Sequence, residues 1–170
     1  MTAYIALLRA VNVGGTGKLP MTELASMCEQ CGFKKSKTYI ASGNVVFQSN
    51  KSEAQVKKAL EKVLAAYAGK PVGVMVRTAA EMAAVLASNP FADAPGNRVV
   101  AIFLDTQPPA NALEMARGQR DEKVSLGVRE VYVYYGGGMA DSKLIIPAAK
   151  TGTARNMNTV AKLAEMSAAL

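Results

Sequence analysis

The order of strand-like and helix-like segments constrains the fold of this chain more than any other feature of its sequence. Residues 3–13 (YIALLRAVNVG) form an apolar run rich in Ile, Leu and Val, which is typical of a buried strand. Residues 19–33 predict a helix that ends at Gly32, because apolar side chains recur on one stripe before that glycine. Residues 37–49 (KTYIASGNVVFQS) predict a hairpin around the Ser-Gly-Asn tripeptide.

A second helix and a further strand follow this hairpin. Residues 52–68 have apolar side chains at helical spacing, with Ser52 as the N-cap and Gly69 as the terminator. Residues 72–77 (VGVMVR) then predict a strand. The first part of the chain therefore reads β-α-β-β-α-β, which is the order of the ferredoxin-like unit.

The rest of the chain repeats this order in a shorter form. A helix over 79–89 stops at Pro90, and a strand is predicted at 98–105. The second part is completed by three further predicted elements: a helix near 110–118, a β pair within 122–135 and helical segments from Ser142 onward. These elements are inferred from the spacing of apolar residues alone.

We therefore predict an α+β protein with two tandem ferredoxin-like (βαββαβ) halves, packed as one compact unit with helices against sheets. The first half spans residues 1–90, and the second half, with a C-terminal helix, spans 91–170. No sequence repeat accompanies the duplication, so it is inferred from element order.

Composition is that of a globular protein with a moderate basic surplus. Half of the residues are hydrophobic, and 20 Lys and Arg face 13 Asp and Glu, which gives a net charge of +7. The surplus favours anionic partners weakly, since the lysines are dispersed and there is no Trp. No apolar run approaches a membrane span and no signal peptide begins the chain, so we expect a cytoplasmic protein without membrane contact.

The absence of histidine excludes several mechanisms. Ser-His-Asp and Cys-His nucleophile systems and His-ligated metal sites all require a residue type that the chain lacks. Cys28 and Cys31 form a lone CxxC without a second ligand pair, so no metal site is expected. They also close a helix, whereas redox-active pairs open one, and we interpret them as helix-face residues.

The segment RAVNVGGTGK carries the first candidate ligand site. Arg9 and Asn12 lie in the predicted strand, and Gly14, Gly15 and Lys18 lie in the loop that follows. Glycine-rich loops let backbone N–H groups approach an anion, which Lys18 could neutralise. The spacing is not that of a P-loop, and a simple strand-to-helix connection is the alternative interpretation.

Two further segments carry polar side chains that could face a ligand. Ser42 and Asn44 flank the tip of the predicted hairpin, where a tight turn alone accounts for both residue types. In TGTARNMNTV, Thr153 is predicted to cap a helix.

The same segment supplies Arg155, Asn156 and Asn158, a charged fork with two amides. The asparagines could instead satisfy local backbone groups, as asparagines near a helix start often do.

Four stretches, LLRAVNVGG, YIASGNVVF, NPF and GTARNMNTV, resemble in the same order the bacterial family known as domain of unknown function 1697. The resemblance spans essentially the whole chain and implies two ferredoxin-like halves. The activity of the family is unassigned, so the resemblance transfers no catalytic residue. The family usually has tryptophan where this chain has Met157, and we interpret this position as a filler of the interior rather than a stacking platform.

The sequence leaves three functional interpretations open. A small anionic or nucleotide-like ligand could bind between the two halves, where the Arg9 and Arg155 segments would share a pocket. Alternatively, the chain is a nucleic-acid-binding or protein-interaction module, although Tyr132, Tyr134 and Tyr135 only loosely imitate the stacking aromatics of RNA-binding sheets. Finally, the polar clusters could form a structural network.

Whether the chain is an enzyme is left undecided by its sequence. Glu23, Asp141 and Glu165 are available as bases without any supporting motif. The sequence likewise indicates no cofactor and does not set the oligomeric state.

Overall fold

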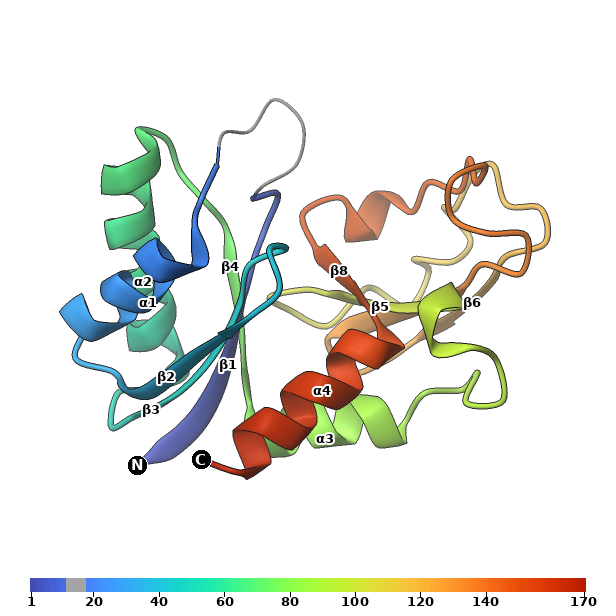
Figure 1. The fold of residues 1–170 in the computed structure, drawn as a ribbon. Helices are drawn as coiled ribbons and strands as arrows, with labels where there is room; N and C mark the ends of the chain where they lie inside the picture. Colours follow the sequence, from blue (N-terminus) through green and yellow to red (C-terminus); the bar gives the residue numbers. More distant parts are fainter. Residues whose placement is uncertain (12–17) are drawn as a thin grey trace. The chain divides into compact units, whose positions relative to one another are not determined.

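A computed structural model describes residues 1–11 and 18–170 of the chain (Figure 1). Within these residues it contains two four-stranded antiparallel sheets and four α-helices. The described chain divides into two units, residues 1–82 with 163–170 and residues 83–162. The predicted site residues Asn12, Gly14 and Gly15 lie outside the described residues.

The first unit has the predicted element order. Its elements are β1 Thr2–Leu8, α1 Met21–Gln30, β2 Lys34–Tyr39, β3 Asn44–Ser49, α2 Glu53–Ala68 and β4 Val74–Thr78. The sheet order is β2-β3-β1-β4, and all neighbouring strands are antiparallel. This order brings the first and third strands together at the centre, as the ferredoxin-like unit requires.

Local sequence signals explain the second helix well. The hydroxyl of Ser52 accepts a hydrogen bond from the backbone N–H of Gln55, whose side chain in turn accepts one from Ser52 N–H, so the two form a capping box. Gly69 ends α2 in the left-handed conformation, at φ 71°. The apolar stripe of α2, with Val56, Leu60 and Leu64 fully or almost fully buried, packs in the core of the first unit.

The second unit repeats the sheet. Its strands are β5 Val99–Phe103, β6 Lys123–Leu126, β7 Glu130–Tyr134 and β8 Thr153–Asn156, in the order β6-β7-β5-β8. In each sheet a helix follows the fourth strand directly, α3 Ala79–Ala87 after β4 and α4 Met157–Ala168 after β8. The predicted fold class, two tandem ferredoxin-like α+β halves, is confirmed.

The predicted helix near 110–118 is wrong. This stretch forms successive four-residue turns, in which Ala112 N–H donates to Pro109 O at 3.0 Å and Glu114 N–H to Asn111 O at 3.1 Å. The backbone of Arg117 pairs instead with that of Ile145, with both N–O distances 2.8 Å. Pairing with a distant segment therefore prevails over local helical spacing.

The predicted helical segments from Ser142 onward are wrong for most of residues 142–156, whereas the helical prediction is confirmed from Met157 onward, where α4 forms. Only a short 3-10 helix, Pro147–Ala149, forms before β8, and Thr153 is the first residue of that strand rather than a helix cap. The helix begins at Met157, where Asn156 Oδ1 accepts the Thr159 N–H at 2.9 Å. The strand forms because β8 pairs with β5 along its whole length, which local sequence does not reveal.

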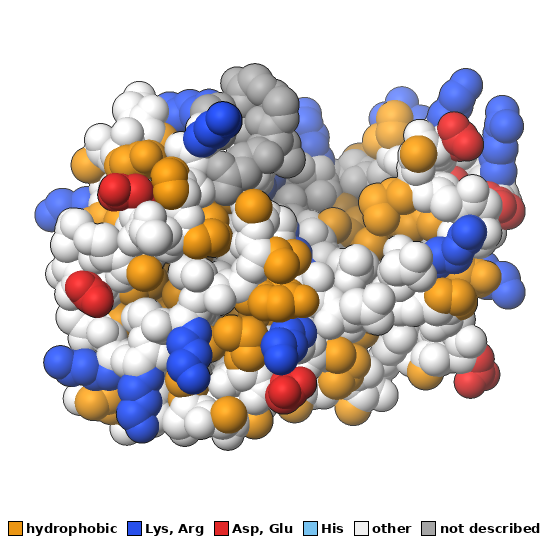
Figure 2. Space-filling view, in the orientation of Figure 1, with side chains coloured by type: hydrophobic (Ala, Val, Ile, Leu, Met, Phe, Trp, Pro, Cys, Tyr) orange, Lys and Arg blue, Asp and Glu red, His pale blue; other side chains and the backbone are white. Residues whose placement is uncertain are grey.

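On the face shown in Figure 2, basic side chains are spread among other side chains rather than gathered in one patch. Figure 2 shows Lys and Arg among apolar and neutral side chains on the face in view. Among residues 1–11 and 18–170, no helix is long and apolar enough to cross a membrane.

Candidate ligand site

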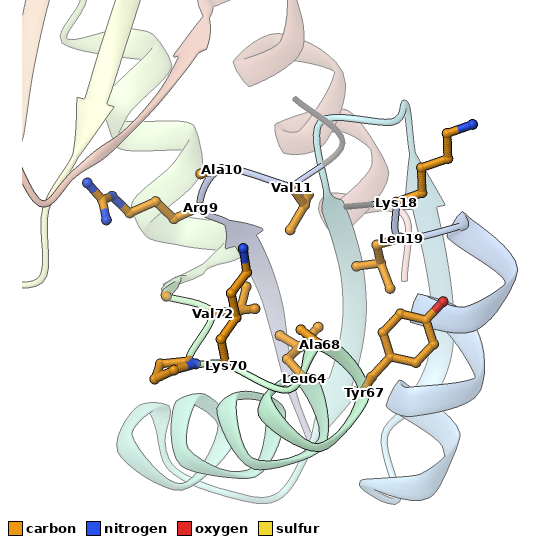
Figure 3. Close-up of a pocket in the computed structure, with 12 residues that line it drawn as sticks. Arg9, Ala10, Val11, Lys18, Leu19, Leu64, Tyr67, Ala68, Lys70 and Val72 are labelled. Carbon is orange, nitrogen blue, oxygen red and sulfur yellow. The ribbon is translucent and has the colours of Figure 1, made fainter. Parts of the chain in front are cut away.

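A pocket of about 370 Å³ lies in the first unit where β1 ends (Figure 3). Four segments meet there: the residues after β1, those before α1, the last turn of α2 and the turn leading into β4. The lining residues are Arg9, Ala10, Val11, Lys18, Leu19, Leu64, Tyr67, Ala68, Lys70, Pro71, Val72 and Gly73. The pocket thus joins Arg9 and Lys18, the two described residues of the first predicted site.

The floor of this pocket is apolar and its rim is polar. Val11, Leu19 and Leu64 are all less than 9% exposed and belong to the core of the first unit. Tyr67 is 48% exposed, and Figure 3 shows its hydroxyl and the Lys70 ammonium on different sides of the apolar centre. A ligand here would meet aliphatic side chains below and polar groups at the edge.

All charged residues in the described part of the pocket lining are basic. They are Arg9, Lys18 and Lys70, and no Asp or Glu is among the described residues that line it. Figure 3 shows the Arg9 and Lys18 side chains extending away from the centre in opposite directions, whereas Lys70 stands beside it. Like charges around an opening sum their potentials, so the pocket favours an anion.

Backbone hydrogen bonds hold the pocket walls. Leu8 N–H donates to Gly43 O at 2.8 Å and Arg9 N–H to Gly73 O at 2.9 Å. The predicted strand over 3–13 ends at Leu8, and Ala10 has φ 55°. Because the chain bends here, Arg9 is exposed, and the expectation that it is buried within a strand is wrong.

The hairpin residues of the second predicted site build the turn between β2 and β3. Asn44 is fully buried, and its Nδ2 donates to Tyr39 O at 2.8 Å and to Ser42 Oγ at 2.9 Å. Gly43 has φ 90°, and a Cβ there would lie 2.6 Å from Val11 Cγ2. Close packing of the turn against a pocket residue therefore requires glycine.

The third predicted site lies in the second unit and is engaged with its own chain. Arg155 is 7% exposed, and its Nη1 donates to Thr153 Oγ1 at 2.8 Å and to Ala154 O at 2.9 Å. Burial lowers the pKa of Arg155 to about 10. Asn156 caps α4. A pocket shared by the Arg9 and Arg155 segments stays a prediction.

Two neighbours of Arg155 have close contacts within the second unit. Asn158 lies against the backbone of Gly96, where a Cβ would come within 2.2 Å of its Oδ1. Met157 is 4% exposed, so its side chain fills the interior.

Tyr67 and Lys70 are the pocket residues that sequence reasoning missed. The helical spacing of residues 52–68 places Tyr67 on the apolar stripe of α2, and Lys70 follows the helix-ending Gly69. The sequence does indicate that Lys70 lies on a turn at the end of the helix, because it stands between the helix-terminating Gly69 and Pro71. Their approach to Arg9 and Lys18 depends on tertiary structure.

Both cysteines are free and buried near the end of α1. Cys28 is fully buried and Cys31 is 9% exposed. Burial is the main cause that raises the pKa of Cys28 from 9.0 to about 12, and the charge of the neighbouring Cys31 thiolate is the second. Burial also raises the pKa of Cys31. Within residues 1–11 and 18–170, no three His, Cys, Asp or Glu side chains are grouped to hold a metal ion.

We expect the Cys28 thiol to resist modification in the folded protein, because a buried protonated thiol is a poor nucleophile. In a Cys31→Ala variant, Ellman's reagent at pH 8 should react fully only after unfolding. Above pH 9 the unfolded thiol loses its proton while the folded one keeps it, so this group lowers stability as pH rises towards 12. Rapid native-state labelling would contradict the expectation.

The fold and this pocket define an α+β protein of two tandem ferredoxin-like halves with a basic, apolar-floored pocket in the first. The chain belongs to the family described as "Protein of unknown function (DUF1697)", which matches residues 1–132. The family predicted from the four motifs is therefore confirmed.

A solved structure supports the fold. The chain is similar to the conserved bacterial protein SP0830 from Streptococcus pneumoniae, with 24% identity, a TM-score of 0.77 and 98% of each chain covered. At this identity the likeness bears on the fold alone. No curated protein matches the chain.

Proposed function

We propose that the pocket of the first unit binds a small anion that carries an apolar or ring-shaped group, such as a nucleotide. One observation carries the proposal: the described residues that line this apolar pocket of about 370 Å³ include three cations and no carboxylate. This volume falls within the usual range of small-molecule sites. The exposed ring of Tyr67 offers a surface for a planar group, and Lys70 offers a point charge for a phosphate.

The proposal is one of binding and includes no reaction. The described residues that line the pocket offer no carboxylate to act as a general base. Glu23, Asp141 and Glu165, the carboxylates considered as bases, do not line the pocket. A ligand-binding role therefore fits the pocket better than hydrolysis.

We expect AMP to raise the melting temperature of the protein and adenosine, which lacks the phosphate, to raise it much less. In Lys70→Gln the affinity for AMP should fall about three- to tenfold, since one charge at a partly exposed site is worth on the order of 1 kcal/mol. Calorimetric titration measures the affinities. Lys62→Gln is the matched control, because Lys62 is exposed on α2 and does not line the pocket.

Inorganic phosphate and pyrophosphate extend the comparison. Tighter binding of AMP than of phosphate would support a contribution from the apolar floor. Equal losses in Lys70→Gln and Lys62→Gln, or no stabilisation by any anion, would contradict the proposal.

The nucleic-acid alternative has one supporting observation. Strand β2, at the edge of the first sheet, carries Lys34, Lys35 and Lys37. Lysines on an edge strand also discourage association with other strands, which accounts for them without a partner. Tyr132 is 2% exposed and its hydroxyl donates to Val85 O at 2.8 Å, so it is not exposed for base stacking.

Labelled single-stranded RNA at low salt tests this alternative in the same assay. Salt-dependent binding that Lys35→Gln weakens and Lys70→Gln leaves unchanged would favour the β2 edge over the pocket.

A further inference from the structure

The two units cover one face of their sheets in different ways. In the first, helices α1 and α2 connect the strands and pack against the sheet. In the second, the corresponding connections, residues 104–122 and 135–152, contain no α-helix. Irregular connections fill space less completely than apolar helix stripes, and a cavity remains over the second sheet.

This cavity has a volume of about 560 Å³ and an apolar lining. Six aliphatic residues line it, namely Ile102, Leu144, Ile145, Ile146, Pro147 and Ala149. The remaining lining residues are Tyr135 and two cations, Arg117 and Lys150, and no carboxylate is among them. Ile145 is 60% exposed, so part of its aliphatic surface is open to a ligand.

Backbone contacts hold the walls of the cavity together. The paired N–H and C=O groups of Arg117 and Ile145 join the two connections at 2.8 Å in both directions. Next to this bridge, Gly118 has φ 72°, and a Cβ there would meet Lys143 O at 2.1 Å. Such close approach shows that the two connections form one wall rather than two separate loops.

Glu122, five residues after Arg117, is a carboxylate near this wall in sequence that is engaged elsewhere. Glu122 is 5% exposed, and its carboxylate accepts hydrogen bonds from Arg120 N–H at 2.6 Å and from the Ser142 hydroxyl. These contacts and a nearby cation hold the pKa of Glu122 below its ordinary value. The acidic residues near this wall in sequence, Glu114, Asp121, Glu122 and Asp141, are not among the described residues that line the cavity, and both of its charged lining residues are basic.

We propose that this cavity binds an apolar carboxylate of the medium-chain fatty acid class. The alkyl chain lies against the aliphatic lining, and the carboxylate pairs with Arg117 or Lys150. Charge complementarity selects this occupant over a neutral or cationic amphiphile, because both charged lining residues are basic. The site lies within the second unit and does not depend on the function proposed for the first.

Three ligands of equal chain length test the charge requirement: decanoate, decanol and decylammonium. By calorimetric titration below micelle-forming concentrations, decanoate should bind at least tenfold more tightly than decylammonium, with decanol between them. Each methylene removed from the carboxylate should weaken binding by up to about fourfold, as expected for burial of a CH₂ group. Equal affinities for decanoate and decylammonium would overturn the proposal.

Variants locate the site. Ala149→Phe should fill the cavity and weaken decanoate and decanol alike, whereas Lys150→Met and Arg117→Met should weaken decanoate but not decanol. Lys123→Met is the matched control, since Lys123 is exposed on β6 and does not line this cavity.

If Ala149→Phe proves unfolded by circular dichroism, the two charge variants still decide the question. Methionine keeps an unbranched apolar side chain at each position, and the Arg117–Ile145 pairing involves backbone atoms that these substitutions do not remove. Decanoate binding that survives in the Arg117→Met, Lys150→Met double variant would overturn the proposal. So would binding that is abolished by Lys70→Gln, which would assign the fatty acid to the pocket of the first unit.

Discussion

Replacing Phe47 by alanine is expected to lower the free energy of unfolding by about 3–5 kcal/mol, the usual cost of removing a fully buried aromatic ring. Phe47 lies on β3 with no exposed surface. Its ring stacks on that of Phe33, with centroids 4.2 Å apart and planes 6° apart, and a second ring, Tyr4, lies 6.0 Å away. Removal therefore loses both the transfer free energy and the aromatic contacts.

Denaturant titration measures this effect, and the melting temperature should fall by on the order of 10 °C for a chain of this size. Tyr67→Ala is the control, because Tyr67 is 48% exposed and its removal should cost less than about 1 kcal/mol. Similar losses in the two variants would mean that the core of the first unit is not organised around the Phe33 and Phe47 stack.

Replacing Arg155 by alanine is expected to lower the free energy of unfolding by about 2–4 kcal/mol. The guanidinium donates to Thr153 Oγ1 and Ala154 O, and the side chain is 7% exposed. Truncation removes these hydrogen bonds and leaves a space in the second unit. Thermal melting and urea titration should both report the loss.

Arg155→Met separates the role of volume from that of charge. Burial alone disfavours the charged guanidinium, as its lowered pKa indicates, so an apolar side chain of similar length should recover part of the stability that alanine loses. An Arg155→Ala protein that melts like the parent but loses stabilisation by AMP would contradict the structural role and support a site shared with Arg9.

Arg155 has a counterpart that the sequence did not reveal. Arg77 on β4 is 1% exposed, and its Nη1 donates to Val76 O at 2.9 Å, as that of Arg155 does to Ala154 O. Each arginine lies on the last strand of its sheet in chain order, opposite a residue of the first strand of that sheet, β1 or β5. Each also directly precedes the residue that caps the next helix, Thr78 for α3 and Asn156 for α4. Matching positions in the two halves favour a structural role for both arginines.

Part of the candidate site could be predicted from sequence. Arg9 and Lys18 flank a glycine-rich segment, and that composition points to an anion without knowledge of the fold. Tyr67 and Lys70 could not be added, because the end of α2 reaches β1 only through packing in the core of the first unit. The cavity of the second unit could not be predicted for a related reason: the sequence predicted a helix near residues 110–118, where the structure has turns.

The sequence by itself determined the features that depend on neighbours within a few residues. The Ser52 cap, the apolar stripe of α2, the Gly69 terminator and the hairpin at Gly43 all arise from local hydrogen bonds and side-chain spacing. Only the tertiary structure decided that residues 153–156 form a strand and that residues 110–118 do not form a helix. Each outcome depends on backbone pairing with a segment far along the chain, Thr153–Asn156 with β5 and Arg117 with Ile145, and local propensity does not contain such pairing.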